Sequence, residues 1–337
     1  MNKTFIVAEL SANHNHQLEL AKRTILAAKE AGVDAVKLQT YTADTITLDC
    51  DGSDFQIHGG LWDGYTYYKL YQEAYTPWDW HKELFEYAQS LGLVCFSTPF
   101  DKTAVDFLEA LGNPIFKIAS FEITDIPLIE YAASKHKPMV ISTGIATIQD
   151  IEDAIAACRR VGNNDITLLK CTSEYPAPLS KANLLTIPDM KQRFGVKVGV
   201  SDHSMTNTLP IAAVALGATM VEKHLILDRS MGGPDSGFSM QPDEFKAMVD
   251  SIREVEQVLG RVDYPENTSQ IAGRSGCRSL YVAEDMKAGD VITEQNVRSV
   301  RPGYGLAPKY LPEILGKRVN CDLTKGDRMK LEYIANK

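Results

Sequence analysis

The sequence predicts an α/β protein, a (β/α)8 TIM barrel followed by a small β-rich module. Short β-rich segments alternate with amphipathic segments eight times in the first three quarters of the 337 residues. The β-rich segments are nearly continuous apolar runs, as expected for parallel strands that are buried on both faces. Eight alternations within about 260 residues are typical of a TIM barrel, because open parallel sheets usually have fewer strands.

The predicted strands share β-branched, apolar composition and end at polar residues. They cover residues 5–10, 35–40, 93–98, 115–120, 139–143, 167–172, 196–200 and 220–224. The clearest predicted helices are amphipathic, and each ends at a glycine, the residue that most readily closes a helix. They cover residues 18–31, 77–91, 148–161 and 243–259.

The alternation stops after Gly260. The segment that follows is polar and has no clear period, whereas the last part of the chain has short β pieces separated by glycine turns, at residues 279–282, 291–292 and 297–300. We therefore predict a barrel domain over 1–262, a linker over 263–275 and a small module over 276–337. Because so small a unit is marginally stable alone, we expect it to dock on another surface.

Composition and charge exclude several classes of function. The formal net charge of −9 argues against nucleic acid as the main partner, and an anionic substrate would need a locally basic pocket. No apolar run approaches the ~20 residues of a membrane span. The six cysteines are scattered without a Cys-x-x-Cys pair, and the N-terminus lacks the apolar core of a signal peptide. We expect a cytoplasmic protein that binds no membrane.

Two histidines follow neighbouring predicted strands, and a helical segment separates them. Residues two apart share one face of a strand, so Ser201 would point with His203 and Glu222 with His224. Two neutral imidazoles beside oxygen donors suit a divalent metal that keeps positions open for substrate. The alternative is that His203 and His224 are unrelated histidines with local hydrogen bonds.

Other polar residues also lie where the predicted strands end. In TIM barrels this end carries the active site. The residues are Glu9, Lys37, Gln39, Thr98, Lys117, Ser120, Glu122, Ser142, Lys170 and Ser173. Lysines and hydroxyls bind phosphate and carboxylate oxygens, so their convergence predicts an anion site beside the metal. Each lysine taken alone is more often a solvated loop residue.

The segment 49–76 interrupts the compact alternation after the second predicted strand. It is rich in glycine and aromatic residues, including Trp62, Tyr65, Tyr68 and Tyr71. Long loops in compact barrels are usually functional. These aromatic side chains could stack on the apolar face of a sugar, or they could only plug the barrel rim.

These residues fall into motifs that resemble the sialic acid synthase family over essentially the whole chain. That family joins a TIM barrel to a C-terminal antifreeze-like (SAF) domain, so the resemblance implies this fold. The matching motifs are Ala8-Glu9-Leu-Ser-Ala-Asn13-His14, Val36-Lys37-Leu-Gln39-Thr40, Ser97-Thr98-Pro-Phe, Phe116-Lys117-Ile-Ala-Ser120-Phe-Glu122, Ser142-Thr-Gly, Lys170-Cys-Thr-Ser-Glu-Tyr175-Pro, Ser201-Asp202-His203, Glu222-Lys-His224, Gly233-Pro-Asp235 and Val300-Arg301-Pro-Gly.

Within the family, several motifs resemble the pseudaminic acid branch more than the N-acetylneuraminate branch. Among them are Gly60-Leu-Trp-Asp before the tyrosine-rich segment and the Thr76-Pro-Trp motif. Two positions depart from the common pattern. His16 stands where many relatives have glycine, and Ser173 stands where the sialic acid enzymes usually have asparagine.

The resemblance implies a synthase that condenses phosphoenolpyruvate with an open-chain acetamido sugar. Carbon 3 of phosphoenolpyruvate attacks the sugar aldehyde, water adds at carbon 2, and C–O cleavage releases phosphate. A Mn²⁺ or Mg²⁺ ion on His203 and His224 would polarise the aldehyde. Phosphoenolpyruvate would be held by Lys37, Thr98, Lys117, Ser120, Ser142 and Ser201.

Further roles follow from the same resemblance. Tyr175 and Gln39 would contact the sugar. Four carboxylates, which the sequence does not rank, would handle water, protons and sugar hydroxyls. They are Glu9, Glu122, Glu222 and Asp235. Family members form domain-swapped homodimers in which the SAF domain of one chain caps the other barrel, so Arg301 would reach the partner's site; alternatively, Arg301 is a solvated turn residue.

Several functions therefore compete. The leading hypothesis is a synthase acting on 2,4-diacetamido-2,4,6-trideoxy-altrose, and the nearest alternative keeps this chemistry with an N-acetylneuraminate or legionaminate precursor. A second alternative is a Schiff-base aldolase that uses Lys117 or Lys170. A third, from another class, is a non-catalytic carbohydrate-binding or ice-binding protein that acts through its C-terminal module. The charged barrel mouth favours an enzyme.

Overall fold

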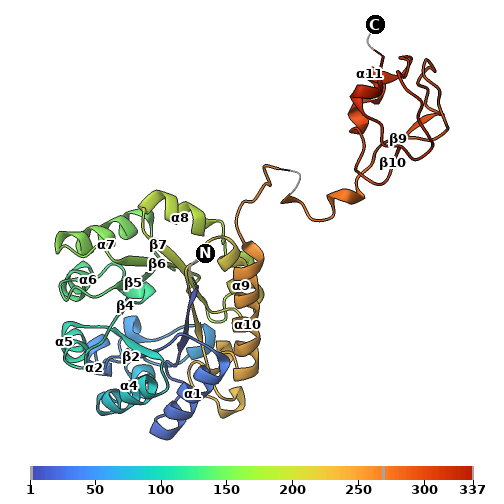
Figure 1. Ribbon diagram of the computed structural model, residues 1–337. Coiled ribbons are helices and arrows are strands. Elements are labelled where there is room, and N and C mark those ends of the chain that lie inside the picture. The colour runs from blue at the N-terminus through green and yellow to red at the C-terminus, as the bar shows by residue number, and fades with distance from the viewer. Residues whose placement is uncertain (1–2, 268–269, 336–337) are drawn as a thin grey trace. The chain divides into compact units, whose positions relative to one another are not determined.

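The structure is a computed structural model that describes residues 3–267 and 270–335. It contains two compact units, Met1–Gly260 and Arg261–Lys337 (Figure 1). The boundary lies close to the predicted end of the barrel domain. The separate linker over 263–275 remains a prediction.

The first unit is a closed barrel of eight parallel strands, which confirms the predicted fold class. Each strand pairs with the next along the chain, and β1 closes the barrel by pairing with β8. The strands are β1 (Phe5–Glu9), β2 (Ala35–Thr40), β3 (Val94–Pro99), β4 (Phe116–Ile118), β5 (Met139–Ser142), β6 (Ile166–Cys171), β7 (Lys197–Asp202) and β8 (Met220–His224).

Two strands differ from the prediction by two residues at the end that carries the polar residues, and the other strands end within one residue of it. Strand β4 stops at Ile118 because Ser120–Glu122 turns into a 3-10 helix. Strand β7 continues to Asp202, so Ser201 belongs to the strand and His203 directly follows it. The apolar runs therefore locate these strands correctly and misplace their ends by two residues.

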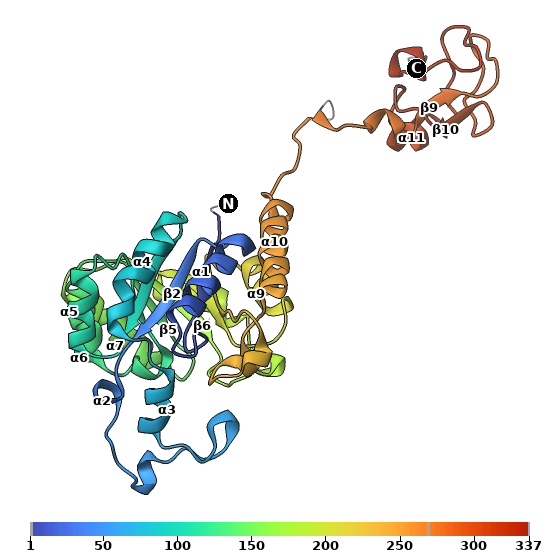
Figure 2. The same ribbon diagram turned by 90° about the horizontal axis from the view of Figure 1, so that it is seen from below.

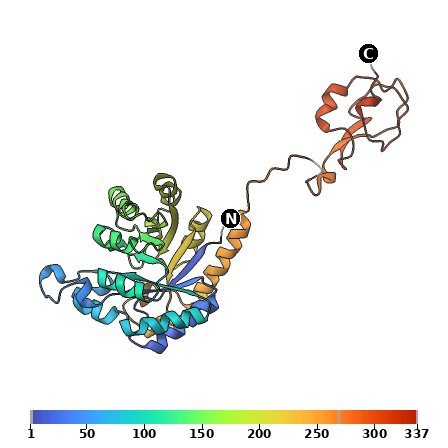
Figure 3. The ribbon, with the colours of Figure 1, turned by 60° about the vertical axis from the view of Figure 1, so that its left-hand side comes forward.

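Helices surround the barrel, as Figures 1 and 3 show. They are α1 (Leu18–Ala31), α4 (His81–Ser90), α5 (Lys102–Ala110), α6 (Ile126–Ala133), α7 (Ile148–Arg160), α8 (Thr186–Phe194), α9 (Thr208–Ala215) and α10 (Pro242–Leu259), while α2 (Ala43–Ile46) and α3 (Tyr67–Ala74) lie in the connection between β2 and β3. Helix α10 packs against α9 and α1. Helix α4 begins later than predicted, because Trp78–Trp80 forms a 3-10 turn first.

The connection between β2 and β3 holds the predicted insertion, but it is not a plain loop. It contains α2 and α3, and in Figure 2 this segment projects from the end of the barrel opposite the N-terminus. This is the end where the parallel strands finish. The insertion is thus placed to form part of a wall around the barrel mouth.

Strand periodicity explains why the barrel interior is apolar at one end and charged at the other. Val7, Phe96, Val140, Leu169 and Met220 form a buried cluster inside the barrel. Residues two or four positions further along a strand share the inward face. They include Glu9 in β1 and both Glu222 and His224 in β8. The same strand geometry that builds the core therefore delivers charged groups to its carboxyl end.

The second unit has its own small core and a two-stranded antiparallel sheet. Strands β9 (Ser279–Val282) and β10 (Val297–Val300) pair as predicted, and α11 (Leu311–Ile314) follows. The predicted strand at 291–292 is wrong, because Val291 forms only an isolated bridge with Arg318. Across the described parts of both units, no helix is both long and apolar enough to cross a membrane.

Candidate active site

A buried cluster of opposite charges occupies the centre of the barrel mouth. The Lys37 ammonium forms an ion pair with Glu9 and lies 3.5 Å from Glu222 Oε1. Lys117 Nζ lies 3.3 Å from the same Glu222 oxygen. All four residues are at most 4% exposed. Buried charges at this density are costly unless they are paired and serve a site.

The pKa shifts follow from this pairing. Burial opposes the charge on Glu222, but Lys117 and Lys37 hold the pKa of its carboxyl below the ordinary value. Burial raises the pKa of Glu9 despite Lys37, and it lowers the pKa of Lys117 despite Glu222. The two carboxyl groups of the cluster therefore have pKa values shifted in opposite directions, that of Glu9 upward and that of Glu222 downward.

Hydroxyl groups surround the two lysines. Lys37 donates to Thr98 Oγ1 at 3.2 Å, and Ser201 donates to Glu222 at 3.3 Å. Ser120 Oγ accepts the backbone N–H of Gly144 at 3.1 Å. The buried Ser142 hydroxyl has no hydrogen-bond partner among the described residues. Such an orphaned donor in a cationic pocket is suited to an anionic ligand.

Gly144 lets the chain pass close to this pocket. A Cβ atom there would lie 2.1 Å from Ser173 Oγ and 2.9 Å from Ser120 Oγ. The glycine of the Ser142-Thr-Gly motif therefore keeps room for the hydroxyls of two other strand ends.

The two histidines meet beside the charged cluster, with ring centroids 5.3 Å apart. His203 Nδ1 lies 3.2 Å from the Thr172 carbonyl, a contact that orients the ring and leaves Nε2 available. Burial lowers the pKa of His224 well below 6.5, so its imidazole is neutral. His224 Nδ1 is buried without a hydrogen-bond partner in the part of the chain that the structure describes.

These features fit a divalent ion. Asp235 Oδ2 lies 4.0 Å from His224 Nδ1 and adds an oxygen near the imidazoles. Among residues 3–267 and 270–335, no group of three or more His, Cys, Asp or Glu side chains forms a complete set of metal ligands. Of the residues present, His203 and His224 could therefore supply two imidazole donors to such an ion, which would leave its remaining positions for water or substrate.

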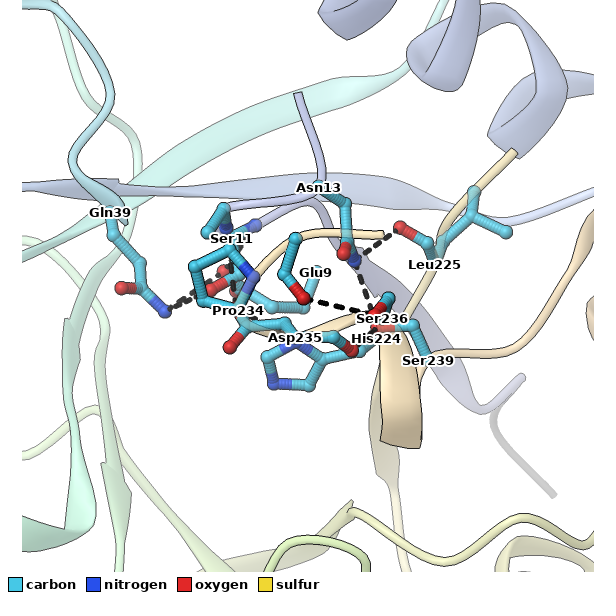
Figure 4. A network of polar contacts seen from close by, with 12 residues as sticks. Glu9, Ser11, Asn13, Gln39, His224, Leu225, Pro234, Asp235, Ser236 and Ser239 are labelled. Atoms are coloured by element: carbon cyan, nitrogen blue, oxygen red, sulfur yellow. Dashed lines mark hydrogen bonds and ion pairs between the residues drawn. The ribbon is translucent and has the colours of Figure 1, made fainter. Parts of the chain in front are cut away.

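A polar network fixes Asp235 next to His224 (Figure 4). Its Oδ2 accepts the backbone N–H of Ala12 at 3.3 Å, and its carbonyl accepts the Ser239 hydroxyl at 2.7 Å. Asn13 donates to Ser239 at 2.8 Å and to the Leu225 carbonyl at 3.0 Å. The loops after β1 and β8 are thus joined, and burial raises the pKa of Asp235.

Gln39 belongs to the same region, as Figure 4 also shows. Its amide donates to Ser11 Oγ at 2.9 Å and to Glu9 Oε1 at 3.3 Å. Ser11 and Ser239 were not predicted as site residues, because they belong to no periodic pattern. The only available signal was their proximity to the Asn13 and Asp235 motifs.

Glu122 enters the mouth from the 3-10 helix that ends β4. Its Oε2 is buried and lacks a hydrogen-bond partner within the described residues. Burial raises the pKa of this carboxyl to about 7, although Lys117 opposes the shift. Glu122 can therefore hold or release a proton near neutral pH.

An aromatic wall covers the histidines. The Tyr175 ring lies 4.5 Å from His203, and the Phe238 ring lies 4.9 Å from His224. Trp62 lies beyond them, 5.7 Å from Tyr175 and 6.5 Å from Phe238. Phe238 was not predicted from the sequence, because it comes from a loop without a recognisable pattern.

Lys170 lies apart from this cluster, and Arg301 belongs to the second unit. Lys170 donates to the Cys171 carbonyl at 2.7 Å, and its strand neighbour Leu169 takes the inward position, so the expectation that Lys170 joins the mouth is wrong. This disfavours a Schiff base on Lys170. Arg301 is exposed in the turn after β10.

Paired lysines and carboxylates, hydroxyls and two histidines at the carboxyl ends of a closed parallel barrel define a TIM-barrel enzyme. Comparison with known families gives the particular class. The NeuB family model matches residues 24–264, and the SAF domain model matches residues 278–327. The chain belongs to the NeuB family, and the predicted combination of barrel and SAF domain is confirmed.

Known relatives and structures agree with this assignment. Pseudaminic acid synthase from Helicobacter pylori is 49% identical over 94% of this chain and 93% of its own length. The enzyme of the same name from Campylobacter jejuni is 47% identical over 97% and 96%. The crystal structure of N-acetylneuraminic acid synthetase from Leptospira borgpetersenii matches with a TM-score of 0.72 and 31% identity, over 80% of this chain and 89% of that one.

Proposed function

We propose that this protein is a pseudaminic acid synthase, which condenses phosphoenolpyruvate with 2,4-diacetamido-2,4,6-trideoxy-altrose and releases phosphate. The observation that carries the proposal is the buried lysine pair, Lys37 and Lys117, within a ring of hydroxyls and next to two facing histidines. The sugar follows from the 46–49% identity to three enzymes of this name, against 37% for N,N'-diacetyllegionaminic acid synthases.

The lysines and hydroxyls supply the anion subsite. Lys37 and Lys117 neutralise the phosphate and carboxylate of phosphoenolpyruvate, overriding the negative charge of the whole chain. The surrounding hydroxyl groups orient these oxygens and come from Thr98, Ser120, Ser142 and Ser201. In this role the Ser142 hydroxyl, which has no partner among residues 3–267 and 270–335, obtains a hydrogen bond from the ligand.

His203 and His224 would hold the divalent ion, Mn²⁺ or Mg²⁺. When bound, it supplies Lewis acidity toward the aldehyde oxygen of the sugar. Asp235 lies close enough to orient a hydroxyl or a water beside that oxygen. Gln39 and Tyr175 contact the sugar from opposite sides of the mouth.

The carboxylates have different roles, because their surroundings give them different pKa values. Glu222, held ionised by two lysines, positions the ammonium groups against the phosphoenolpyruvate oxygens. Glu122, with a pKa near 7, exchanges a proton with the attacking water or the sugar. Carbon 3 of phosphoenolpyruvate bonds to the aldehyde carbon, water bonds to carbon 2, and the C–O bond to phosphate breaks.

A partner chain completes the site in a domain-swapped homodimer. The loops that follow β4 to β8 expose large apolar side chains around the mouth, including Phe121, Ile145, Leu179, Met205 and Met231. An apolar rim of this kind marks a surface that another body covers. In this proposal the partner's SAF domain covers it and brings Arg301 to the sugar.

Phosphate release from phosphoenolpyruvate tests the function. The purified protein with Mn²⁺ is assayed against the altrose derivative, N-acetylmannosamine and the legionaminate precursor, each with and without chelator. We expect chelator-sensitive release with the altrose derivative. Release only with another sugar would replace the substrate, and borohydride trapping without metal dependence would support a Schiff base on Lys117 instead.

A further inference from the structure

Trp62 reaches the active site from an unusual place, the tip of the insertion between β2 and β3. Ile57 donates its N–H to the Tyr65 carbonyl at 2.8 Å, and Gln56 pairs with Thr66 in an antiparallel bridge, so 56–66 forms a hairpin-like strap. Trp62 lies at the tip of this strap, in a 3-10 helix.

Specific contacts hold the strap against the loop that follows β8. The Trp62 indole N–H donates to the Pro234 carbonyl at 3.0 Å, and the Leu61 side chain lies over Gly237. The Trp62 ring contacts Tyr175 and meets the edge of Phe238. With its N–H engaged, the indole contributes only carbon surface to the aromatic wall.

The spacing places this wall where the far end of a sugar would lie. Ring-to-ring distances of 4.5 Å and 5.7 Å lead from His203 through Tyr175 to Trp62. An open-chain sugar of six carbons is about 6 Å long, from its carbon–carbon bonds of ~1.5 Å. A sugar whose aldehyde lies at the histidines would therefore extend along this wall, with carbon 6 in the direction of Trp62.

We propose that Trp62 is a specificity-determining residue that selects sugars with a methyl group at carbon 6 over sugars with a hydroxymethyl group. The indole presents only carbon atoms and therefore favours the methyl group, because a hydroxyl against it would lose its water without gaining a partner. This inference rests on the proposed function and adds a residue and a recognised group to it.

The test compares Trp62→Ala and Trp62→Phe with the wild type. Each enzyme is assayed with 2,4-diacetamido-2,4,6-trideoxy-altrose and with its counterpart that carries a hydroxyl at carbon 6. We expect the wild type to prefer the 6-deoxy sugar by roughly 10- to 200-fold in kcat/KM. Trp62→Ala should reduce this preference at least tenfold and raise the sugar KM, while the KM for phosphoenolpyruvate stays within about twofold.

Trp78→Phe is the matched control. Trp78 also donates its indole N–H to a backbone carbonyl, that of Tyr41 at 3.1 Å, but it stacks on Phe107 away from the histidines. Its replacement should leave the sugar preference unchanged. An unchanged preference in Trp62→Ala, with an active wild type, would overturn the inference and leave the proposed function intact. A folded wild type without phosphate release on any sugar would overturn both.

Discussion

Glu122 illustrates how a single buried carboxyl can weaken the fold while it serves the site. Burial raises the pKa of this group to about 7 from 4.5, and its Oε2 has no hydrogen-bond partner within the described residues. Between pH 4.5 and 7 the unfolded chain releases the proton and the folded protein keeps it. Stability therefore falls as the pH rises through this window, since the unfolded state binds fewer protons there.

Glu122→Gln should accordingly stabilise the barrel at pH 8 and leave it unchanged at pH 4. The expected gain at pH 8 is up to about 3 kcal/mol, from about 1.4 kcal/mol per pKa unit. Urea unfolding at both pH values measures it, with exposed Glu152→Gln as the control. A loss of stability at pH 8 would show that Glu122 is not destabilising.

Replacing Ser142 should weaken ligand binding without changing the stability of the fold. Its hydroxyl has no partner in the described structure, so Ser142→Ala should change the free energy of unfolding by less than about 0.5 kcal/mol. The same change should raise the KM for phosphoenolpyruvate about 10- to 100-fold, as expected for a lost hydrogen bond to a charged group.

Replacing the neighbouring Thr143 should have the opposite effects, a loss of stability and unchanged binding of phosphoenolpyruvate. Its buried hydroxyl donates to the Leu169 carbonyl at 3.1 Å, so Thr143→Val should cost about 1 kcal/mol of stability. Its KM for phosphoenolpyruvate should stay unchanged. Equal KM values in Ser142→Ala and the wild type would remove Ser142 from the anion subsite.

Residues of the site differ in how far the sequence could predict them. Those at strand ends, such as Glu9, Lys37 and His224, follow from counting alternate positions along apolar runs. Ser239 and Phe238 do not, because their positions depend on how the loop after β8 folds back onto the loop after β1. Long-range loop contacts of this kind leave no local periodicity.

At the scale of elements, the sequence predicted all eight strands because parallel barrel strands are apolar on both faces. The ends of β4 and β7 were less predictable. Polar residues end an apolar run whether they continue the strand, as Ser201 and Asp202 do, or turn into a 3-10 helix, as Ser120 does. Hydrogen bonding to the neighbouring strand decides between these outcomes.

Strand β7 also contains Gly199, at a position that tolerates no side chain. A Cβ atom there would lie 2.5 Å from the Met220 carbonyl oxygen and 2.8 Å from Met220 Cβ, both in β8. Gly199→Ala should therefore force apart the two strands that carry the histidines. We expect a loss of about 1–3 kcal/mol in the free energy of unfolding.

Urea unfolding of the two glycine variants measures this effect. Gly52→Ala is the control, because its Cβ atom would meet only ordinary contacts, the nearest 3.4 Å from Cys50 Sγ. Equal unfolding midpoints for Gly199→Ala and Gly52→Ala would show that β7 and β8 adjust without cost.

At the scale of the whole molecule, the chain divides into two compact units, the barrel and the unit that contains the SAF domain. The proposed dimer makes a distinct prediction about which chain supplies Arg301. Arg301→Ala and His224→Ala should each have little activity as pure proteins. When the two are unfolded together and refolded as a mixture, half of the dimers pair one variant with the other. In such a dimer, one barrel has both His224 and the partner's Arg301.

The mixture should therefore recover about a quarter of the wild-type activity if each site combines residues from two chains. Refolding each variant alone controls for recovery by refolding itself, and size-exclusion chromatography checks that dimers have formed. If Arg301 served the barrel of its own chain, every site in the mixture would lack either Arg301 or His224. Activity no higher than that of the separate variants, from a sample of dimers, would therefore contradict capping by the partner.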